Sequence, residues 1–452
     1  MMRRLFPFLF IAFICSDSSF SQEAQSKKSL YETFVQGKLQ GEVRNFFMNT
    51  INEGELKDYY TNATGIALNY QTKPLYGFSA GVHFRSVFKT FGVSLSQEDP
   101  QAGAAAKWEY ELYDLLEKGT YKDLNKVQEL YLKYQYKNSY LTIGRIETEY
   151  TPLLNNSDGR MGPFAHQGAW WHHQWNENSS LDLGFINAIS PRSTTDWFSL
   201  NEGIGLFSNG FLQNGEIADY RNYTNSEGLG VFKYTYSKAN LNFKLYDIFI
   251  HNLLNTVWLE TDYSYEAWRL GLQYAVQQGA ASQKDLPLQN QYVRNGENGQ
   301  VLSSQLSWSK YNWTLSLAYS YLFDTGRFLF PKELGRDRFY TSIPRSRMEG
   351  LGDATATVLK ISKSYPRSNL NLLLEFQSIQ GLKLNEFTFN KYNKDETFQV
   401  NSIINYNAER FLRGLSFEAL LVYRRNLNDS SNPVIFNRSN FLQLNFMTYF
   451  QF

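Results

Sequence analysis

Alternation of apolar and polar residues in short segments is the feature that most constrains this chain. It recurs from Gly37 to the C-terminus, and no run approaches the roughly 18 apolar residues that a membrane-spanning helix needs. Successive strand side chains point to opposite faces, so each segment predicts a strand with one apolar and one polar side. The last segment, Asn440 to Phe452, is a clear example, because Leu444 and Phe446 flank Asn445. We therefore expect an all-β chain.

The terminal segment indicates how the sheet is completed. A chain end usually frays, so an aromatic residue at the very last position, Phe452, is unusual for an edge strand of a soluble sheet. Inside lipid a strand cannot fray, because unpaired backbone groups are too costly there. The segment thus predicts the closing strand of a transmembrane antiparallel β-barrel. The aromatic content of 17%, with 31 Tyr and 35 Phe, fits the rings that gather at both membrane interfaces.

Counting the alternating segments gives about 18 strands, an even number in the range of single-chain outer-membrane barrels. The expected strands are Gly37 to Thr50, Asp58 to Thr72, Leu75 to Phe88, Val127 to Lys137, Ser139 to Glu147, Gln167 to Trp175, Ser180 to Ile189, Gly228 to Tyr236, Asn240 to Ile250, Asn252 to Tyr263, Trp268 to Gln277, Val301 to Ser309, Trp313 to Phe323, Asp353 to Lys363, Asn369 to Gln380, Phe398 to Asn407, Gly414 to Arg425 and Asn440 to Phe452.

The connections between these strands alternate between very short and long. Lys137-Asn138 and Ser237 to Ala239 are tight turns, whereas Pro191 to Glu227 and Asp324 to Gly352 run to tens of residues. Outer-membrane barrels have short periplasmic turns and long extracellular loops, and a soluble sandwich or propeller has no reason to alternate so regularly. The spacing places both chain ends on the periplasmic side. A barrel of this size leaves a wet channel unless loops fold into the lumen.

The N-terminal region divides into two parts before the barrel. Residues 1–21 combine Arg3 and Arg4 with an apolar run and a small-residue exit at Ser19 and Ser21, which predicts a secretory signal peptide cleaved on export. Residues 22–36 form a periplasmic lead-in with a helical turn expected at Leu30 to Phe34. Residues 37–452 then form the barrel, which absorbs a length that would otherwise suggest about three domains.

Composition excludes several classes of function. The single cysteine, Cys15, lies in the signal peptide, so the mature chain has no thiol for disulfide, metal or nucleophile chemistry. The chain has 44 Lys and Arg and 43 Asp and Glu residues, and both totals become 42 without Arg3, Arg4 and Asp17. This neutrality argues against a nucleic-acid partner.

A metal site or an enzyme finds little support in the sequence. His172 and His173 are neighbours on one strand, so they point to opposite faces and cannot bind one metal ion together. Ser208-Asn209-Gly210 resembles part of a barrel phospholipase motif, but Leu206 stands where the motif needs His. We expect no cofactor, no metal and no catalytic residues.

One long loop is expected to contain a helix that covers the barrel mouth. Glu98 to Pro100 would start it and Gly119 would end it. Its apolar stripe would comprise Ala105, Trp108, Leu112 and Leu115.

Three segments resemble OprD-type substrate-specific porins, and the resemblance spans nearly the whole mature chain. They are Ser29 to Met48 (SLYETFVQGKLQGEVRNFFM), Gly144 to Phe164 (GRIETEYTPLLNNSDGRMGPF) and Arg347 to Asp353 (RMEGLGD). The resemblance implies an 18-stranded, monomeric or loosely trimeric diffusion channel narrowed by its third and seventh loops. It also implies a ladder of basic residues that conducts small, often carboxylate-bearing solutes.

The third loop corresponds to Thr148 to His166 and the seventh to Asp324 to Gly352. Arginine suits an anion pathway because its guanidinium stays charged and matches a carboxylate with two parallel hydrogen bonds. The strand residues among the candidates could instead solvate the lumen and pair with acidic neighbours such as Glu42, Glu129, Glu375 and Glu418. The candidate pore residues are Arg44, Arg85, Lys133, Arg160, Lys244, Arg336, Arg338, Arg345, Arg347 and Arg424.

The expected function is therefore passive, substrate-selective diffusion of small solutes across a bacterial outer membrane. The expected partners are outer-membrane lipid, lipopolysaccharide, the solutes and the barrel assembly machinery, because a last strand ending in Phe is similar to the signal which that machinery reads. A non-conducting structural or adhesin barrel and a barrel enzyme remain as alternatives. Conductance would separate the first from a porin, and hydrolytic activity would separate the second.

Overall fold

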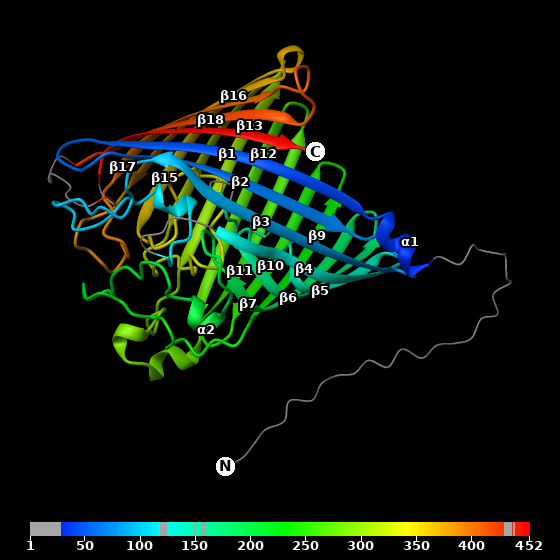
Figure 1. Ribbon diagram of the computed structural model, residues 1–452. Coiled ribbons are helices and arrows are strands. Elements are labelled where there is room, and N and C mark those ends of the chain that lie inside the picture. Colours follow the sequence, from blue (N-terminus) through cyan, green and yellow to red (C-terminus); the bar gives the residue numbers. More distant parts are fainter. Residues whose placement is uncertain (1–28, 118–123, 149–150, 156–159, 429–435, 437–438) are drawn as a thin grey trace.

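The computed structural model describes residues 29–117, 124–148, 151–155, 160–428, 436 and 439–452 (Figure 1). The expected signal peptide, part of the lead-in and Asp158-Gly159 lie outside the described residues. The strands are β1 (Lys38–Asn52), β2 (Tyr59–Gln71), β3 (Phe78–Gly92), β4 (Leu124–Tyr136), β5 (Ser139–Ile146), β6 (Ala165–Asn176), β7 (Ser179–Ser190), β8 (Phe198–Ser199), β9 (Leu229–Lys238), β10 (Leu241–Ile250), β11 (Leu254–Tyr265), β12 (Trp268–Gly279), β13 (Gln300–Lys310), β14 (Trp313–Leu322), β15 (Ala354–Tyr365), β16 (Leu370–Gln380), β17 (Thr397–Asn407), β18 (Leu415–Asn426) and β19 (Phe441–Gln451).

The strands form one closed antiparallel barrel of 18 strands, with the two-residue β8 as an extra strand beside β7. Each strand pairs with its sequence neighbour, and β7 pairs with β9 because β8 belongs to the intervening loop. The expected all-β barrel of about 18 strands is thus confirmed. Most boundaries fall within a few residues of the expected ones, because alternation is a strong signal where one face of a strand is apolar.

The barrel closes where β1 pairs with β19, from Glu42 opposite Gln451 to Asn52 opposite Phe441. Beyond the strand end, the Gly41 N–H donates to the Phe452 carbonyl (2.8 Å) and the Phe452 N–H donates to the Gly41 carbonyl (3.0 Å). A Cβ at residue 41 would lie 2.2 Å from the Phe452 ring, so the ring needs glycine beneath it. The last residue is therefore held in the ladder.

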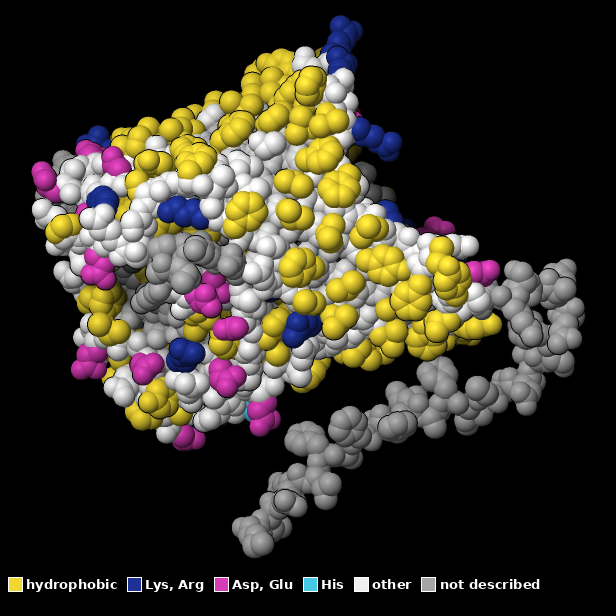
Figure 2. All heavy atoms as spheres, viewed as in Figure 1, with side chains coloured by type: hydrophobic (Ala, Val, Ile, Leu, Met, Phe, Trp, Pro, Cys, Tyr) yellow, Lys and Arg dark blue, Asp and Glu magenta, His cyan; other side chains and the backbone are white. Residues whose placement is uncertain are grey.

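The two faces of the wall differ as the alternation predicted. Leu270 and Leu272 on β12 are about half exposed on the outside, whereas Gln273, the next residue along the same strand, is buried inside. Figure 2 shows the same division, with apolar side chains over the strands and most charged side chains on the loops at one end. Apolar residues outside and polar residues inside are the pattern of a barrel in lipid. None of the described helices is both long and apolar enough to span a membrane.

Short turns and long loops lie at opposite ends of the barrel (Figure 1). β1 begins and β19 ends at the short-turn end, next to helix α1 (Leu30–Val35). Ser29 caps α1 by accepting from the Glu32 N–H (3.1 Å), which confirms the helical turn expected at this position. The long-loop end contains α2 (Leu200–Gly203), η2 (Ala281–Asp285) and η3 (Leu288–Asn290), while η4 (Pro366–Ser368) lies in the turn between β15 and β16.

The helix expected between Glu98 and Gly119 is wrong for the described part of that segment. The only helical turn there is η1 (Tyr110–Leu112), in the part described up to residue 117. Asp99 instead forms a tight turn, because its carboxylate accepts from the Gln101 and Ala102 N–H groups (both 2.8 Å). Near its end the segment contacts the loop after β7, because the Leu115 N–H donates to the Ser193 carbonyl (2.9 Å). Tertiary contacts have replaced the helical hydrogen bonds here.

Candidate functional site

The seventh loop, between β14 and β15, lies inside the barrel and is held by amide side chains of the inner wall. Such donors satisfy the carbonyl groups of a buried loop, which would otherwise destabilise it. Gln277 is an example, because its Nε2 donates to the Leu329 carbonyl (2.6 Å) while its Oε1 accepts from the Leu329 N–H (2.7 Å). Further amide donors to this loop, at 2.6 to 3.4 Å, are Gln273, Gln377, Gln399 and Asn401.

The third loop, between β5 and β6, packs directly on the seventh. The Arg336 N–H donates to the Leu153 carbonyl (2.9 Å), and Asn155 Nδ2 donates to the Arg336 carbonyl (2.8 Å). A Cβ at Gly335 would lie 2.0 Å from the Leu153 carbonyl oxygen, so only glycine permits this approach. The described parts of the two loops expected to narrow the channel therefore meet inside the barrel through direct backbone contacts.

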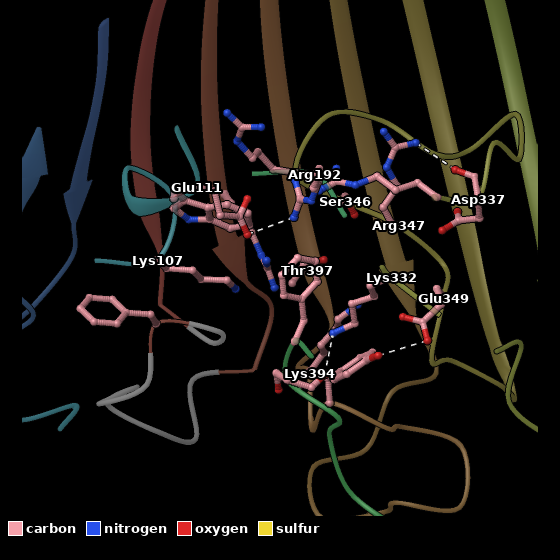
Figure 3. Close-up of a pocket in the computed structure, with 18 of the residues that line it drawn as sticks. Lys107, Glu111, Arg192, Lys332, Asp337, Ser346, Arg347, Glu349, Lys394 and Thr397 are labelled. Carbon is pink, nitrogen blue, oxygen red and sulfur yellow. Dashed lines mark hydrogen bonds and ion pairs between the residues drawn. The ribbon is translucent and has the colours of Figure 1, made fainter. Parts of the chain in front are cut away.

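A cavity of about 540 Å³ lies beside this junction and is rich in positive charge (Figure 3). Its lining includes four carboxylates, Glu111, Asp337, Glu349 and Asp395. The lining includes eight cationic side chains: Lys107, Arg192, Lys332, Arg336, Arg345, Arg347, Lys394 and Arg424. Such an excess of fixed positive charge in a narrow passage attracts anions and repels cations.

Arginines crowd one side of the cavity. Glu111 forms ion pairs with Arg160 and with Arg192, the latter at 3.0 Å. Burial acts to raise the pKa of Glu111, but Arg160, Arg192 and Arg336 outweigh it and hold that pKa well below its usual value. Burial lowers the pKa of Arg336, and the charges of Arg192, Arg347 and Arg160 lower it further. The single negative charge of Glu111 thus lies among several guanidinium groups, which repel one another.

Two lysines at the cavity pack on the same aromatic ring. Lys332 Nζ lies 3.5 Å and Lys394 Nζ 5.3 Å from the centroid of the Tyr392 ring, both within the range of cation–π attraction. The Tyr392 hydroxyl donates to Glu349 Oε1 (3.1 Å), which fixes the ring. Burial lowers the pKa of Lys394 to about 8, and burial also lowers the pKa of Lys332.

Four of the ten candidate pore residues line the cavity: Arg336, Arg345, Arg347 and Arg424. Arg345 also anchors its loop to β19, because Nε donates to Gln443 Oε1 (2.6 Å) and Nη2 donates to Asn445 Oδ1 (3.1 Å). Its guanidinium lies 5.4 Å from the Trp108 ring centroid. Arg345 therefore positions the seventh loop as well as lining the cavity.

Arg160 and Arg338 lie outside this lining. Arg160 contacts a lining residue instead, because its guanidinium pairs with Glu111. Its carbonyl accepts from Arg44 Nη1 (2.9 Å), which links this residue to the barrel wall. The Arg338 carbonyl accepts from Gln273 Nε2 (3.3 Å), so its backbone helps to dock the loop.

The remaining candidates, on the strands, bind wall neighbours. Arg85 pairs with Glu42 on β1 (3.3 Å), and Lys244 pairs with Glu260 on β11 (2.8 Å). Lys133 Nζ lies 3.8 Å from the centroid of the Tyr140 ring. Lys244 also lines a second cavity of about 400 Å³, together with His172, Asp182 and Lys233 among others.

The two histidines point to opposite faces, as expected. His172 Nδ1 lies 2.8 Å from Asp182 Oδ1, whereas His173 stacks on Trp171, with 5.7 Å between the ring centroids. Among the described residues there is no group of three or more His, Cys, Asp or Glu side chains that could hold a metal ion.

Sequence reasoning missed three basic residues of the cavity: Lys107, Arg192 and Lys394. They come from three different loops, and they meet only because those loops fold toward the lumen. Lys332, on the seventh loop, was also not among the ten candidates. A charged residue in a long loop carries no sequence signal that distinguishes the lumen from the outer surface.

No family model and no curated protein matches the chain. Solved structures do resemble it. OccK9 (OpdG) of Pseudomonas aeruginosa has a TM-score of 0.71 at 12% identity, covering 93% of this chain and 99% of that one. OccAB4 of Acinetobacter baumannii has a TM-score of 0.70 at 14% identity, covering 92% and 98%. OpdK of P. aeruginosa, in a structure with vanillate, has a TM-score of 0.68 at 12% identity, covering 93% and 99%.

These neighbours are OprD-family substrate-specific porins, and the alignments cover nearly all of this chain and of each neighbour. The identities are too low to transfer a substrate. They confirm the resemblance seen in the sequence at the level of the fold: this chain has the 18-stranded barrel of the OprD-type porins.

Proposed function

We propose that this chain is an outer-membrane porin that lets small solutes diffuse passively and favours those that carry carboxylates. The observation that carries the proposal is the loop-lined cavity, with eight cationic and four carboxylate side chains. Fixed charges in a narrow passage act strongly because less water screens them there. Binding to several separate cations is weak enough at each step for a solute to leave again.

The fold supports a channel rather than an enzyme or a solid structural barrel. The structural neighbours are porins, and one was crystallised with vanillate, which is a carboxylate. The expected signal peptide of residues 1–21 would direct export, and the held C-terminal Phe452 would suit insertion by the barrel assembly machinery. The outer surface would contact lipid and lipopolysaccharide, with the barrel acting as a monomer or loose trimer.

Two measurements test this function. Purified protein in a planar bilayer should produce stepwise current without an energy source, and the reversal potential in a salt gradient should indicate anion preference. Liposomes containing the protein should swell faster in small carboxylates than in neutral sugars of similar size. Silent membranes would favour a structural barrel, and silent membranes together with lipid or peptide hydrolysis would favour an enzyme.

A further inference from the structure

The cations of the loop-lined cavity form two groups that face the same space. The arginine group comprises Arg192, Arg336 and Arg347, and the lysine pair comprises Lys332 and Lys394. In Figure 3, Arg192 and Arg347 lie on one side of the cavity while Lys332 and Lys394 lie on the other. The two groups are therefore set apart across a single opening.

Carboxylates of the protein leave much of this charge uncompensated. Glu111 is already paired with Arg160 and Arg192, and Glu349 accepts from the Tyr392 hydroxyl and lies 3.7 Å from Lys391 Nζ. Within the described part of the chain, four cations of the two groups form no ion pair with a carboxylate: Lys332, Arg336, Arg347 and Lys394.

Arg336 is the least satisfied member. Its guanidinium forms no hydrogen bond or ion pair with any residue that the structure describes, although its backbone is held by the third loop. Arg347 has a single bond from Nη1 to the Asp337 carbonyl (3.0 Å), and its buried Nε has no partner among the described residues. A buried donor without an acceptor, such as Arg347 Nε, is costly, and the partly exposed Arg336 lines the same cavity.

The lining that the two charged groups share also has an apolar part. Trp108, Phe330, Ile379 and Leu382 contribute to the lining of the same cavity. A purely inorganic ion would leave these side chains in contact with water, whereas a short carbon chain would cover part of them. The arrangement thus fits a solute with an anionic group at each end and a small hydrocarbon body between them.

We propose that this cavity selects small dicarboxylates, with one carboxylate bound by Arg336 and Arg347 and the other received by Lys332 and Lys394. The inference rests on the proposed porin function and narrows its substrate class. A dicarboxylate relieves the repulsion within the arginine group and still meets positive charge at its other end. A monocarboxylate of the same size satisfies only one group.

Succinate and succinamate form a matched pair of probes, because an amide replaces one carboxylate at almost constant size. In single-channel recordings on the full-length mature protein, succinate should interrupt the current for about fivefold longer than succinamate, the order expected for one added charge contact in water. Raising the salt concentration should reduce this ratio by screening. Thermal stabilisation of the detergent-purified protein by each probe gives a second reading that does not depend on conduction.

Variants identify the groups responsible. Arg336→Gln and the double change Lys332→Gln with Lys394→Gln should each bring the succinate to succinamate ratio close to one. Lys284→Gln, which removes an exposed lysine of η2 outside this lining, is the matched control and should keep the ratio. Heat-modifiable gel migration checks that each variant is folded.

Three results would overturn the proposal. Equal succinate and succinamate values in the native protein would remove the preference for two charges, even if carboxylates still pass faster than sugars. An unchanged ratio in the lysine variant would show that the second carboxylate is not bound there. Inorganic phosphate binding as tightly as succinate would mean that charge alone decides. If the protein gave no current in bilayers but succinate still raised its thermal stability, the porin function would be contradicted and the dicarboxylate site would stand.

Discussion

Two basic residues of the barrel wall, Arg85 and Lys244, differ in their surroundings from two arginines of the loop-lined cavity, Arg336 and Arg347. On the wall, Lys244 pairs with Glu260 on the neighbouring strand, and Arg85 on β3 pairs with Glu42 on β1, with β2 between them. At the cavity, Arg336 forms no ion pair with any described carboxylate, and Arg347 binds a backbone carbonyl. The same residue types thus neutralise the lumen in one region and leave net charge in the other.

The register of the sheet explains the difference. Lys244 lies opposite Glu260 in the β10–β11 ladder, so the two side chains meet at a fixed short spacing. Loop residues have no such fixed neighbour, and Arg336 is placed by hydrogen bonds from its backbone to the third loop. Neighbouring strands can therefore hold a counter-charge at a fixed position, as they do for Lys244, whereas the docked seventh loop presents Arg336 without one.

The strongest way to break this comparison is to remove the cavity charges that have no carboxylate partner. Arg336→Ala combined with Arg347→Ala should lower the permeation of small carboxylates relative to neutral sugars on the order of tenfold, because two charges act in a poorly screened passage. Liposome swelling with both solute classes measures this ratio. An equal loss for sugars and carboxylates would mean that the two arginines only keep the loop in shape.

Arg345→Gln tests the anchor of the seventh loop and should have the next largest effect. The change shortens the side chain that binds Gln443 and Asn445, and leaving these buried groups without a partner costs about 1 to 3 kcal/mol. The loop should then move from the wall, which raises single-channel conductance and weakens discrimination between all solutes. A variant with normal conductance and a selective loss of carboxylates would identify Arg345 as a binding residue instead.

A pH titration should produce a smaller change at the cavity. The pKa of Lys394 is lowered to about 8, so its ammonium is charged below that pH and neutral above it. Anion preference, measured as reversal potential in a salt gradient, should therefore decline between about pH 7 and about pH 9. Lys394→Gln should have a lower preference at neutral pH and a flatter profile. The same slope in the variant would assign the titration to another group.

The smallest effect is expected at the wall. Removing both members of a pair, as in Lys244→Ala with Glu260→Ala, leaves the net charge of the lumen unchanged. The permeation ratio of carboxylates to sugars should stay within about twofold of the native value, since partly exposed ion pairs contribute little. A loss as large as that of the Arg336 and Arg347 variant would abolish the distinction between wall and cavity.

Strands were the most predictable part of this chain. The expected Asn240 to Ile250 corresponds to β10 (Leu241–Ile250), because one face of the strand meets lipid and the alternation cannot shift by one residue. The segment around Trp108 was predicted wrongly as a helix, because its apolar residues pack against the inner barrel wall and neighbouring loops without forming one. The segment expected as the seventh loop connects β14 and β15, and four of the ten candidates line the cavity, while their role in a pore stays a prediction.

The sequence alone determined the barrel, its strand count and the end at which the long loops lie. These follow from alternation and spacing, which are local properties that lipid enforces along every strand. Only the tertiary structure decided which cations face the cavity. Arg192, Lys394 and Lys107 come together from separate loops, and Arg345 is turned toward Gln443 of the wall. The physical reason is that a loop takes its position from contacts distant in the chain, which no local pattern records.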